Sequence, residues 1–164
     1  MRRYLIFIGI AVMCLSTAGE CRKAMDYKYP LWLTNSSEQE IMIYINNNGT
    51  VLDPIYPDTT ITKSIKHISK PIPQDFIIRP GEKEIFVESS GPWEEKRRGI
   101  DTLSLVIFSV DTLEKYPWEI IREDYMILQR YDLSMSDLRK LDYSIAYPPT
   151  EAMRNMKMWP RYGE

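Results

Sequence analysis

The sequence predicts a mainly β protein: an antiparallel β-sandwich, immunoglobulin-like in outline, with two short helical insertions near its C-terminal end. Three observations support this fold class. Short runs rich in β-branched and aromatic residues recur along the chain, and turn residues such as Asn-Gly and Pro-Gly separate them. The strongest of these runs, residues 102–110, is apolar on both faces, which is typical of a central strand. With 44% apolar residues in a chain of 164, the protein can bury a core of domain size.

Two hairpins are expected in the first half of the domain: residues 29–35 with 40–46, and residues 75–79 with 82–88. Asn35-Ser36-Ser37 supplies a turn composition for the first hairpin, and Pro80-Gly81 suits a tight turn in the second. In the following central strand, Leu105 and Ile107 are expected to face the core.

Short helices and strands should alternate in the C-terminal third. Asp111 matches a capping pattern, and Pro117 suits the first turn of a helix that runs to about residue 123. Ser134 or Ser136 is placed to cap a second helix in the residues that follow. The remaining strands are expected at residues 125–131 and 142–147.

The first twenty residues have the features of an export signal. Arg2 and Arg3 form a basic start, residues 4–15 carry no charge, and the small residues at 16–18 occupy positions that signal peptidase reads. The uncharged run is too short to span a membrane. After removal of this leader, Cys21 would be the only cysteine of an exported chain.

Cys21 is the candidate lipidation site, because a bacterial lipoprotein carries its diacylglyceryl cysteine just past the signal sequence. Ala18 and Gly19 are small, as such a site favours, whereas Glu20 departs from the usual small residue. Two outcomes stay open: a lipid anchor on Cys21 as the only link to the membrane, or cleavage after Ala18 with simple secretion. Either way the chain is expected in the periplasm or at the outer membrane. The expected organisation is a signal peptide at 1–20, a tether at 21–28, the β-sandwich domain at 29–149 and a C-terminal tail at 150–164.

Four segments of the chain carry a resemblance: residues 56–60 (YPDTT), 111–119 (DTLEKYPWE), 125–132 (YMILQRYD) and 143–149 (YSIAYPP). Together they are similar to a family of small exported proteins and lipoproteins from Gram-negative gut anaerobes that has no assigned activity. The resemblance is most specific over residues 102–149. It implies an exported bacterial protein and nothing about chemistry.

Charge and residue content argue against several classes of function. Loss of the leader leaves 19 basic and 22 acidic side chains, without the basic surplus of a nucleic-acid binder. His67 is the only histidine, and with a single cysteine it cannot complete a common zinc site. Nothing in the sequence pairs His67 with a nucleophile. We therefore expect no catalytic residue, no metal and no cofactor.

A secreted carboxylate-dependent hydrolase is the remaining catalytic alternative, because such an enzyme needs only two suitably spaced acidic residues. The candidates are Glu94, Glu95, Glu123, Asp124, Asp132 and Asp137. Acidic residues in helices and loops lie mostly on solvated faces, so this alternative is the weaker one.

Trp93 is the candidate ligand contact. It follows Gly91-Pro92, a turn that should present the next side chain outward, and an exposed tryptophan can stack on a sugar or anchor a protein contact. The alternative is that Trp93 packs over an end of the domain. Trp159 lies beside Met158 near the C-terminus, and we expect it to pack, either on its own domain or on a partner.

The sequence thus predicts a monomeric, lipoprotein-like binding module of the cell envelope, with a protein or glycan as its ligand. The structural alternative is a surface-assembly subunit of fimbrial type, which would join other subunits by strand exchange.

Overall fold

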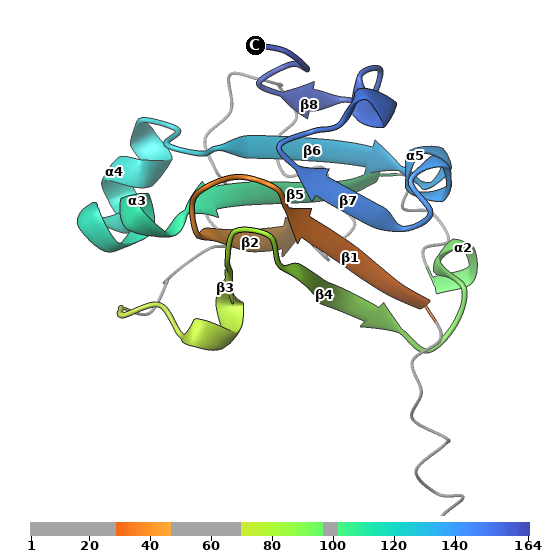
Figure 1. Cartoon of the computed structure of the whole chain (residues 1–164), viewed down its shortest axis with the longest axis horizontal. Coiled ribbons are helices and arrows are strands. Elements are labelled where there is room, and N and C mark those ends of the chain that lie inside the picture. The colour runs from red at the N-terminus through yellow and green to blue at the C-terminus, as the bar shows by residue number, and fades with distance from the viewer. Residues whose placement is uncertain (1–28, 47–69, 97–101) are drawn as a thin grey trace, which may run out of the picture.

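The computed structural model describes residues 29–46, 70–96 and 102–164 (Figure 1). Its strands are β1 (Tyr29–Asn35), β2 (Ile41–Asn46), β3 (Ile77–Ile78), β4 (Lys83–Ser89), β5 (Thr102–Ser109), β6 (Gln129–Ser134), β7 (Ser144–Tyr147) and β8 (Met158–Trp159). Its helices are α2 (Trp93–Lys96), α3 (Val110–Lys115), α4 (Trp118–Glu123) and α5 (Met135–Lys140), with 3-10 turns η2 (Gln74–Phe76) and η3 (Glu151–Met153). The protein is mainly β, as predicted. The leader, the tether, Cys21, His67 and the segment 56–60 lie outside the described residues.

The strands form two sheets. One has the order β4-β1-β7 and the other the order β3-β2-β5-β6-β8, and in Figure 1 the three-stranded sheet lies in front of the five-stranded one. The described pairings are antiparallel except that of β1 with β7, which is parallel. The prediction of a purely antiparallel arrangement is therefore wrong at this pair. Because β1 and β7 are far apart in sequence, no tight turn forces them to run in opposite directions.

Neither expected hairpin forms. β1 and β2 follow one another across the predicted turn at Asn35-Ser36-Ser37, but they lie in different sheets, and β3 and β4 are likewise divided between the sheets. The turns themselves are where the sequence predicts them, and Gly81 has a φ of +80° that suits only glycine well. The strands separate because Leu31 and Leu33 of β1 are buried in a core that also contains residues of the other sheet.

Asn35 is fully buried and connects the turn that follows β1 with the turn between β3 and β4. Its side-chain Nδ2 donates to the carbonyl oxygen of Ile78 at 2.9 Å, and its Oδ1 accepts from the backbone N of Ser37 at 3.0 Å. Its backbone N donates to the carbonyl of Glu82 at 2.9 Å, and its carbonyl accepts from Gly81 N at 2.7 Å. Buried backbone groups at the end of a strand still need hydrogen-bond partners, and Asn35 supplies such partners here.

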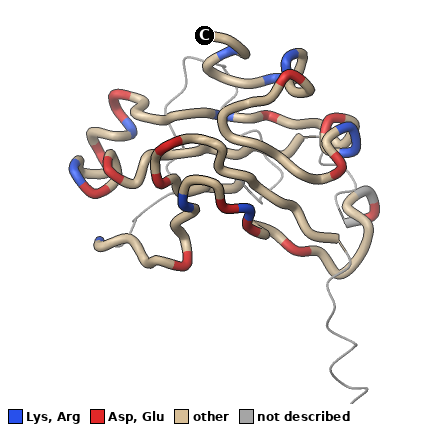
Figure 2. Tube along the Cα trace, viewed as in Figure 1, with Lys and Arg blue, Asp and Glu red and all other residues tan. Residues whose placement is uncertain are grey.

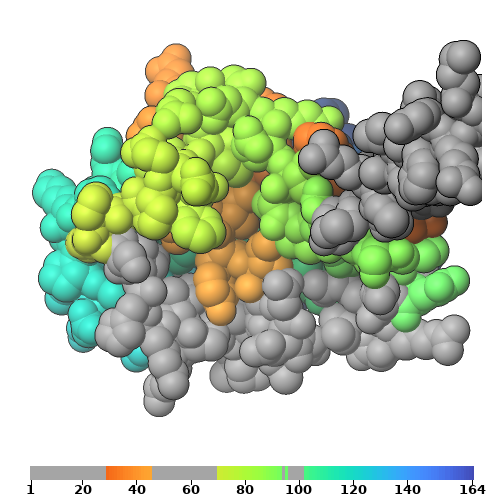
Figure 3. Space-filling view, turned by 90° about the horizontal axis from the view of Figure 1, so that it is seen from below, coloured from red at the N-terminus to blue at the C-terminus, as the bar shows by residue number. Residues whose placement is uncertain are grey.

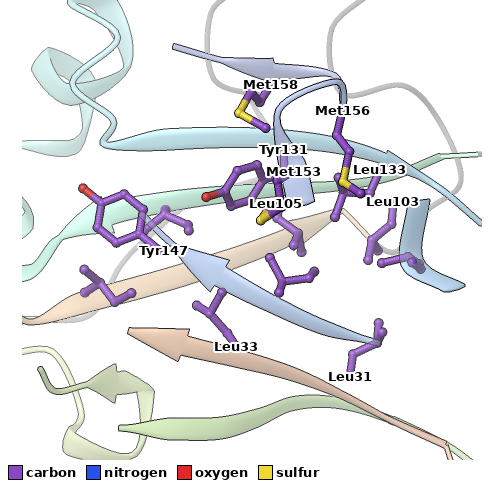
Figure 4. Close-up of a cluster of buried hydrophobic side chains, with 14 of the residues drawn as sticks. Leu31, Leu33, Leu103, Leu105, Tyr131, Leu133, Tyr147, Met153, Met156 and Met158 are labelled. Atoms are coloured by element: carbon purple, nitrogen blue, oxygen red, sulfur yellow. The ribbon is translucent and has the colours of Figure 1, made fainter. Parts of the chain in front are cut away.

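β5 is the central strand, as predicted, and lies between β2 and β6. One of its faces contributes to a core shared by strands of both sheets, which Figure 4 shows in close-up. The side chains labelled there are Leu31, Leu33, Leu103, Leu105, Tyr131, Leu133, Tyr147, Met153, Met156 and Met158. On the opposite face, Val106 and Phe108 pack with Leu113 of α3 and Ile121 of α4.

Local signals at the helix ends are partly correct. Of the two candidate caps for α5, Ser134 is the one used: its Oγ accepts from Asp137 N at 3.1 Å, and the Asp137 carboxylate accepts from Ser134 N at 3.0 Å. The cap predicted at Asp111 is wrong, because Ser109 precedes α3 and Asp111 lies in its first turn. The strand expected from residue 125 starts only after residue 128, since Tyr125 has a positive φ of 52°, outside the strand region.

The C-terminal tail is part of the fold. β8 pairs with β6 at the edge of the five-stranded sheet, and Met153, Met156 and Met158 are buried in the shared core. Trp159 is partly buried and meets the ring of Tyr125 edge-on, with 4.9 Å between ring centroids. Of the two outcomes that the sequence leaves open, packing of the tail on its own domain is the one observed.

Candidate functional site

Trp93, the predicted ligand contact, is a buried residue, so the exposure expected of it is wrong. Only 5% of it is exposed, and its indole Nε1 donates a hydrogen bond to the carbonyl oxygen of Tyr29 at 3.0 Å. The reason is that Trp93 begins the short helix α2, which turns the ring back onto the start of β1. Packing against the domain, the alternative reading of this residue, is what the structure shows.

Two of the candidate carboxylates have structural roles. Asp137 caps α5, and Asp132 is buried with its Oδ2 3.2 Å from Arg130 Nε. Ser104 Oγ donates to the other oxygen of Asp132 at 2.7 Å. The remaining candidates whose side chains are described are exposed: Glu95, Glu123 and Asp124. The side chain of Glu94 lies outside the described part of the chain.

Arg130 keeps its charge beside Asp132. Burial disfavours the charge on Arg130, but a hydrogen bond with Tyr125 and the charge of Asp132 outweigh it and raise the pKa of the guanidinium. Lys157 Nζ adds a second cation 3.9 Å from Asp132 Oδ2. These contacts are those of a structural ion pair, whose main effect is to make the loss of either partner costly.

Predictions on Cys21 and His67 stay predictions, because both residues lie outside the described ranges. Within those ranges, no three or more His, Cys, Asp or Glu side chains gather closely enough to hold a metal ion. Nor does any helix of the described chain combine the length and the apolar character needed to cross a bilayer.

The candidate site is a groove lined by β4 of one sheet and by β2 and β3 of the other, which we call the β2–β4 groove. Its volume is about 660 Å³, within the range of ligand pockets. Its apolar lining includes Ile43 and Ile45 of β2, Phe76 of η2, and Ile85 and Phe86 of β4. Figure 3 looks onto this face, where atoms of β2 (orange) are visible between those of η2 and β3 (yellow-green) and those of β4 (green).

One of the apolar side chains at the groove is unusually exposed. Phe76 is 63% exposed, although phenylalanine normally lies inside a domain. Ile85 is also exposed, but it is opposite Trp32 in the β1–β4 pair, so its side chain lies on the face of Lys83 and not on that of Glu84. A contiguous apolar surface on a soluble domain marks a place where a partner binds. Phe76, together with the other apolar side chains of the lining, therefore marks the groove as the candidate binding site.

The charged side chains at the groove are mainly acidic. Asp75, Glu82 and Glu84 line it together with a single basic residue, Arg79. Figure 2 shows where acidic and basic residues lie along the chain. Arg79 is already held by two carboxylates: its Nε lies 3.6 Å from Glu40 Oε1, and its Nη1 lies 3.6 Å from Glu82 Oε1. A cleft with an excess of one charge concentrates its field, so this groove attracts cations.

The strand register explains why Glu84 lies at the groove. Glu84 is opposite Leu33 in the β1–β4 pair, so the two side chains share one face of the sheet. Leu33 is fully buried on that face, whereas Glu84 is exposed. The inner face of the three-stranded sheet is therefore open to solvent at its β4 edge. The register of the β1–β4 pair shifts between Leu31 and Trp32. Phe86 is therefore an extra residue of β4 and forms a β-bulge beside the groove.

Comparison with protein-family models, with curated proteins and with solved structures found no match for this chain. The resemblance to exported proteins therefore rests on the sequence alone.

The sequence does not predict the groove, because its walls come from segments that the sequence assigns to two separate hairpins. One feature of the sequence does indicate the irregular strand beside the groove. Ile85, Phe86 and Val87 are three consecutive apolar residues, which break the alternation of a strand with one wet face and point to a bulge.

Proposed function

We propose that this protein is a binding module of the cell envelope, which holds a protein or glycan in the β2–β4 groove and catalyses no reaction. The observation that supports this function is the exposure of Phe76 at an apolar groove of ligand size. Apolar surface gains about 25 cal/mol for each Å² that a partner removes from water, so covering this side chain favours binding.

The same proposal covers the arrangement of the sheets and the place of the protein in the cell. The two sheets pack as an immunoglobulin-like β-sandwich, which the core they share supports. Residues 1–20 direct export, and Cys21 carries the lipid that anchors the domain in the periplasm or at the outer membrane.

Photocrosslinking tests the groove. A photoreactive benzoylphenylalanine is placed at Phe76 in cells that export the full chain, and a control places it at Ile120 of α4. Both side chains are exposed, at 63% and 39%, but Ile120 does not line the groove. We expect adducts at Phe76 and none at Ile120, and mass spectrometry then identifies the adduct as protein or glycan. Equal adducts at both positions, or none at Phe76, would contradict the proposal.

Replacement of Cys21 tests the anchor. Cys21→Ala should move the protein from the membrane fraction to the soluble fraction, and intact-mass measurement should show that the parent alone carries acyl chains. A variant that stays in the membrane with the mass of the parent chain would show that the lipid anchor is wrong.

A further inference from the structure

We propose that the occupant of the β2–β4 groove is a basic, apolar segment of another protein, which packs apolar side chains beside Ile43 and Ile45 and pairs a lysine or arginine with Glu84. This inference rests on the proposed function and narrows its ligand from a protein or glycan to one chemistry.

The Glu84 carboxylate has no cation beside it among the described residues, because the nearby basic side chains are engaged elsewhere. Lys83 lies on the opposite face of β4, where its Nζ is 5.0 Å from the centroid of the Trp32 ring. Arg79 is held by Glu82 and a second carboxylate. The Glu84 carboxylate is therefore open to a cation from a partner.

The residues on the other wall favour the same chemistry. Asp75 also lines the groove, and no ion pair joins it to a cation in the described part of the chain. Phe76, beside it, exposes an aromatic ring, over which a lysine or arginine binds favourably. The long stems of such side chains also pack on apolar surface while their charges stay in water. A neutral glycan can donate hydroxyl hydrogen bonds to these carboxylates but leaves their charge uncompensated, so a cationic side chain complements them better.

A second copy of this chain does not fit the groove equally well. β4 is an end strand, and its edge carries Lys83 and the inward-facing Glu84, followed by the bulge at Phe86. Charges, inward-pointing carboxylates and bulges are the features by which natural sheets avoid pairing edge to edge. We therefore assign the groove to a segment of a different protein.

Peptide binding tests the charge of the occupant. The probe is a short, soluble peptide with two leucines flanked by lysines, and its counterpart has glutamate in place of each lysine. We expect the lysine peptide to shift the NMR methyl signals of Ile43 and Ile45 but not that of Ile120, and the glutamate peptide to shift none of them.

A pair of carboxylate variants tests the assigned contact. Glu84→Gln should weaken binding of the lysine peptide about fivefold, the size of a partly exposed ion pair, and added salt should weaken the parent more than the variant. Glu88→Gln is the control, because Glu88 lies on the same strand outside the lining of the groove and its loss should leave affinity unchanged. Both side chains are exposed, and melting curves check that both variants fold.

The possible results distinguish a failure of this inference from a failure of the proposed function. Equal binding of the two peptides at the groove methyls, or unchanged affinity in Glu84→Gln, overturns the assignment of a basic partner and leaves a binding groove in place. Absence of methyl shifts with either peptide also overturns it, and the photocrosslink at Phe76 then decides whether the proposed function fails as well. A dimer in sedimentation that buries these methyls would make a second copy the occupant and overturn the inference.

Discussion

Replacing Trp93 by alanine should destabilise the domain strongly, because this tryptophan is a core residue. Its ring is 5% exposed, and its Nε1 donates to the carbonyl of Tyr29, which fixes the start of β1 against α2. Truncation of a buried tryptophan costs about 3–5 kcal/mol of unfolding free energy. Trp93→Phe keeps most of the apolar ring and removes the N–H donor, so it should cost less, about 1 kcal/mol for the hydrogen bond.

Urea and thermal unfolding measure this cost. For a domain of this size, each kcal/mol lowers the melting temperature by about 3–6 °C, so Trp93→Ala should melt about 10–25 °C below the parent. Ile120→Ala is the control, because Ile120 is 39% exposed on α4 and a substitution at such a position usually changes stability by no more than about 0.5 kcal/mol.

A urea midpoint for Trp93→Ala equal to that of the parent would refute the reasoning. In that case the indole would not pack on β1, and the ring would be free for the contact role that the Gly91-Pro92 turn suggests.

Three further predictions follow from burial and capping. Ile107 is fully buried in the shared core, so Ile107→Ala should lose about 2–5 kcal/mol in urea unfolding and Ile107→Val about 1 kcal/mol; a shared midpoint for both would place this strand at an edge. Ser134→Ala removes the hydrogen bond that caps α5 and should cost about 0.5–2 kcal/mol by the same measurement, whereas Ser136→Ala, at an exposed position, should cost little. Burial raises the pKa of Tyr131, whose hydroxyl donates to the carbonyl of Ala146 at 2.8 Å, so the folded state keeps its proton while the unfolded chain ionises near pH 10. The stability from this group is complete below about pH 10 and is lost as the pH rises further, and alkaline unfolding should be less steep in Tyr131→Phe.

Sequence reasoning succeeds where neighbours along the chain decide the environment of a residue. β5 is predictable because residues 102–110 are apolar on both faces and rich in β-branched and aromatic residues, which is typical of a short strand covered on both sides. Ser134 is predictable as a cap because its partner Asp137 lies three residues further on. Each of these signals is complete within a few residues.

Prediction fails where the environment comes from distant segments. The turn before Trp93 is correctly located, but the direction of the side chain depends on Tyr29, sixty-four positions earlier in the chain. The parallel pairing of β1 with β7 depends on two segments at opposite ends of the domain. Local propensity does not contain such contacts, and tertiary packing overrides it.

Asn35 connects the fold to the candidate site. It holds the carbonyl of Ile78, two residues after Phe76, and through its backbone it holds the carbonyl of Glu82, two residues before Glu84. From this point the two walls of the groove continue in different sheets, so they diverge. A hairpin at Pro80-Gly81 would instead place β3 and β4 side by side, and their ladder of hydrogen bonds would close the space between them. The error in the predicted strand pairing and the existence of the groove thus have one physical cause, the change of sheet that Asn35 stabilises.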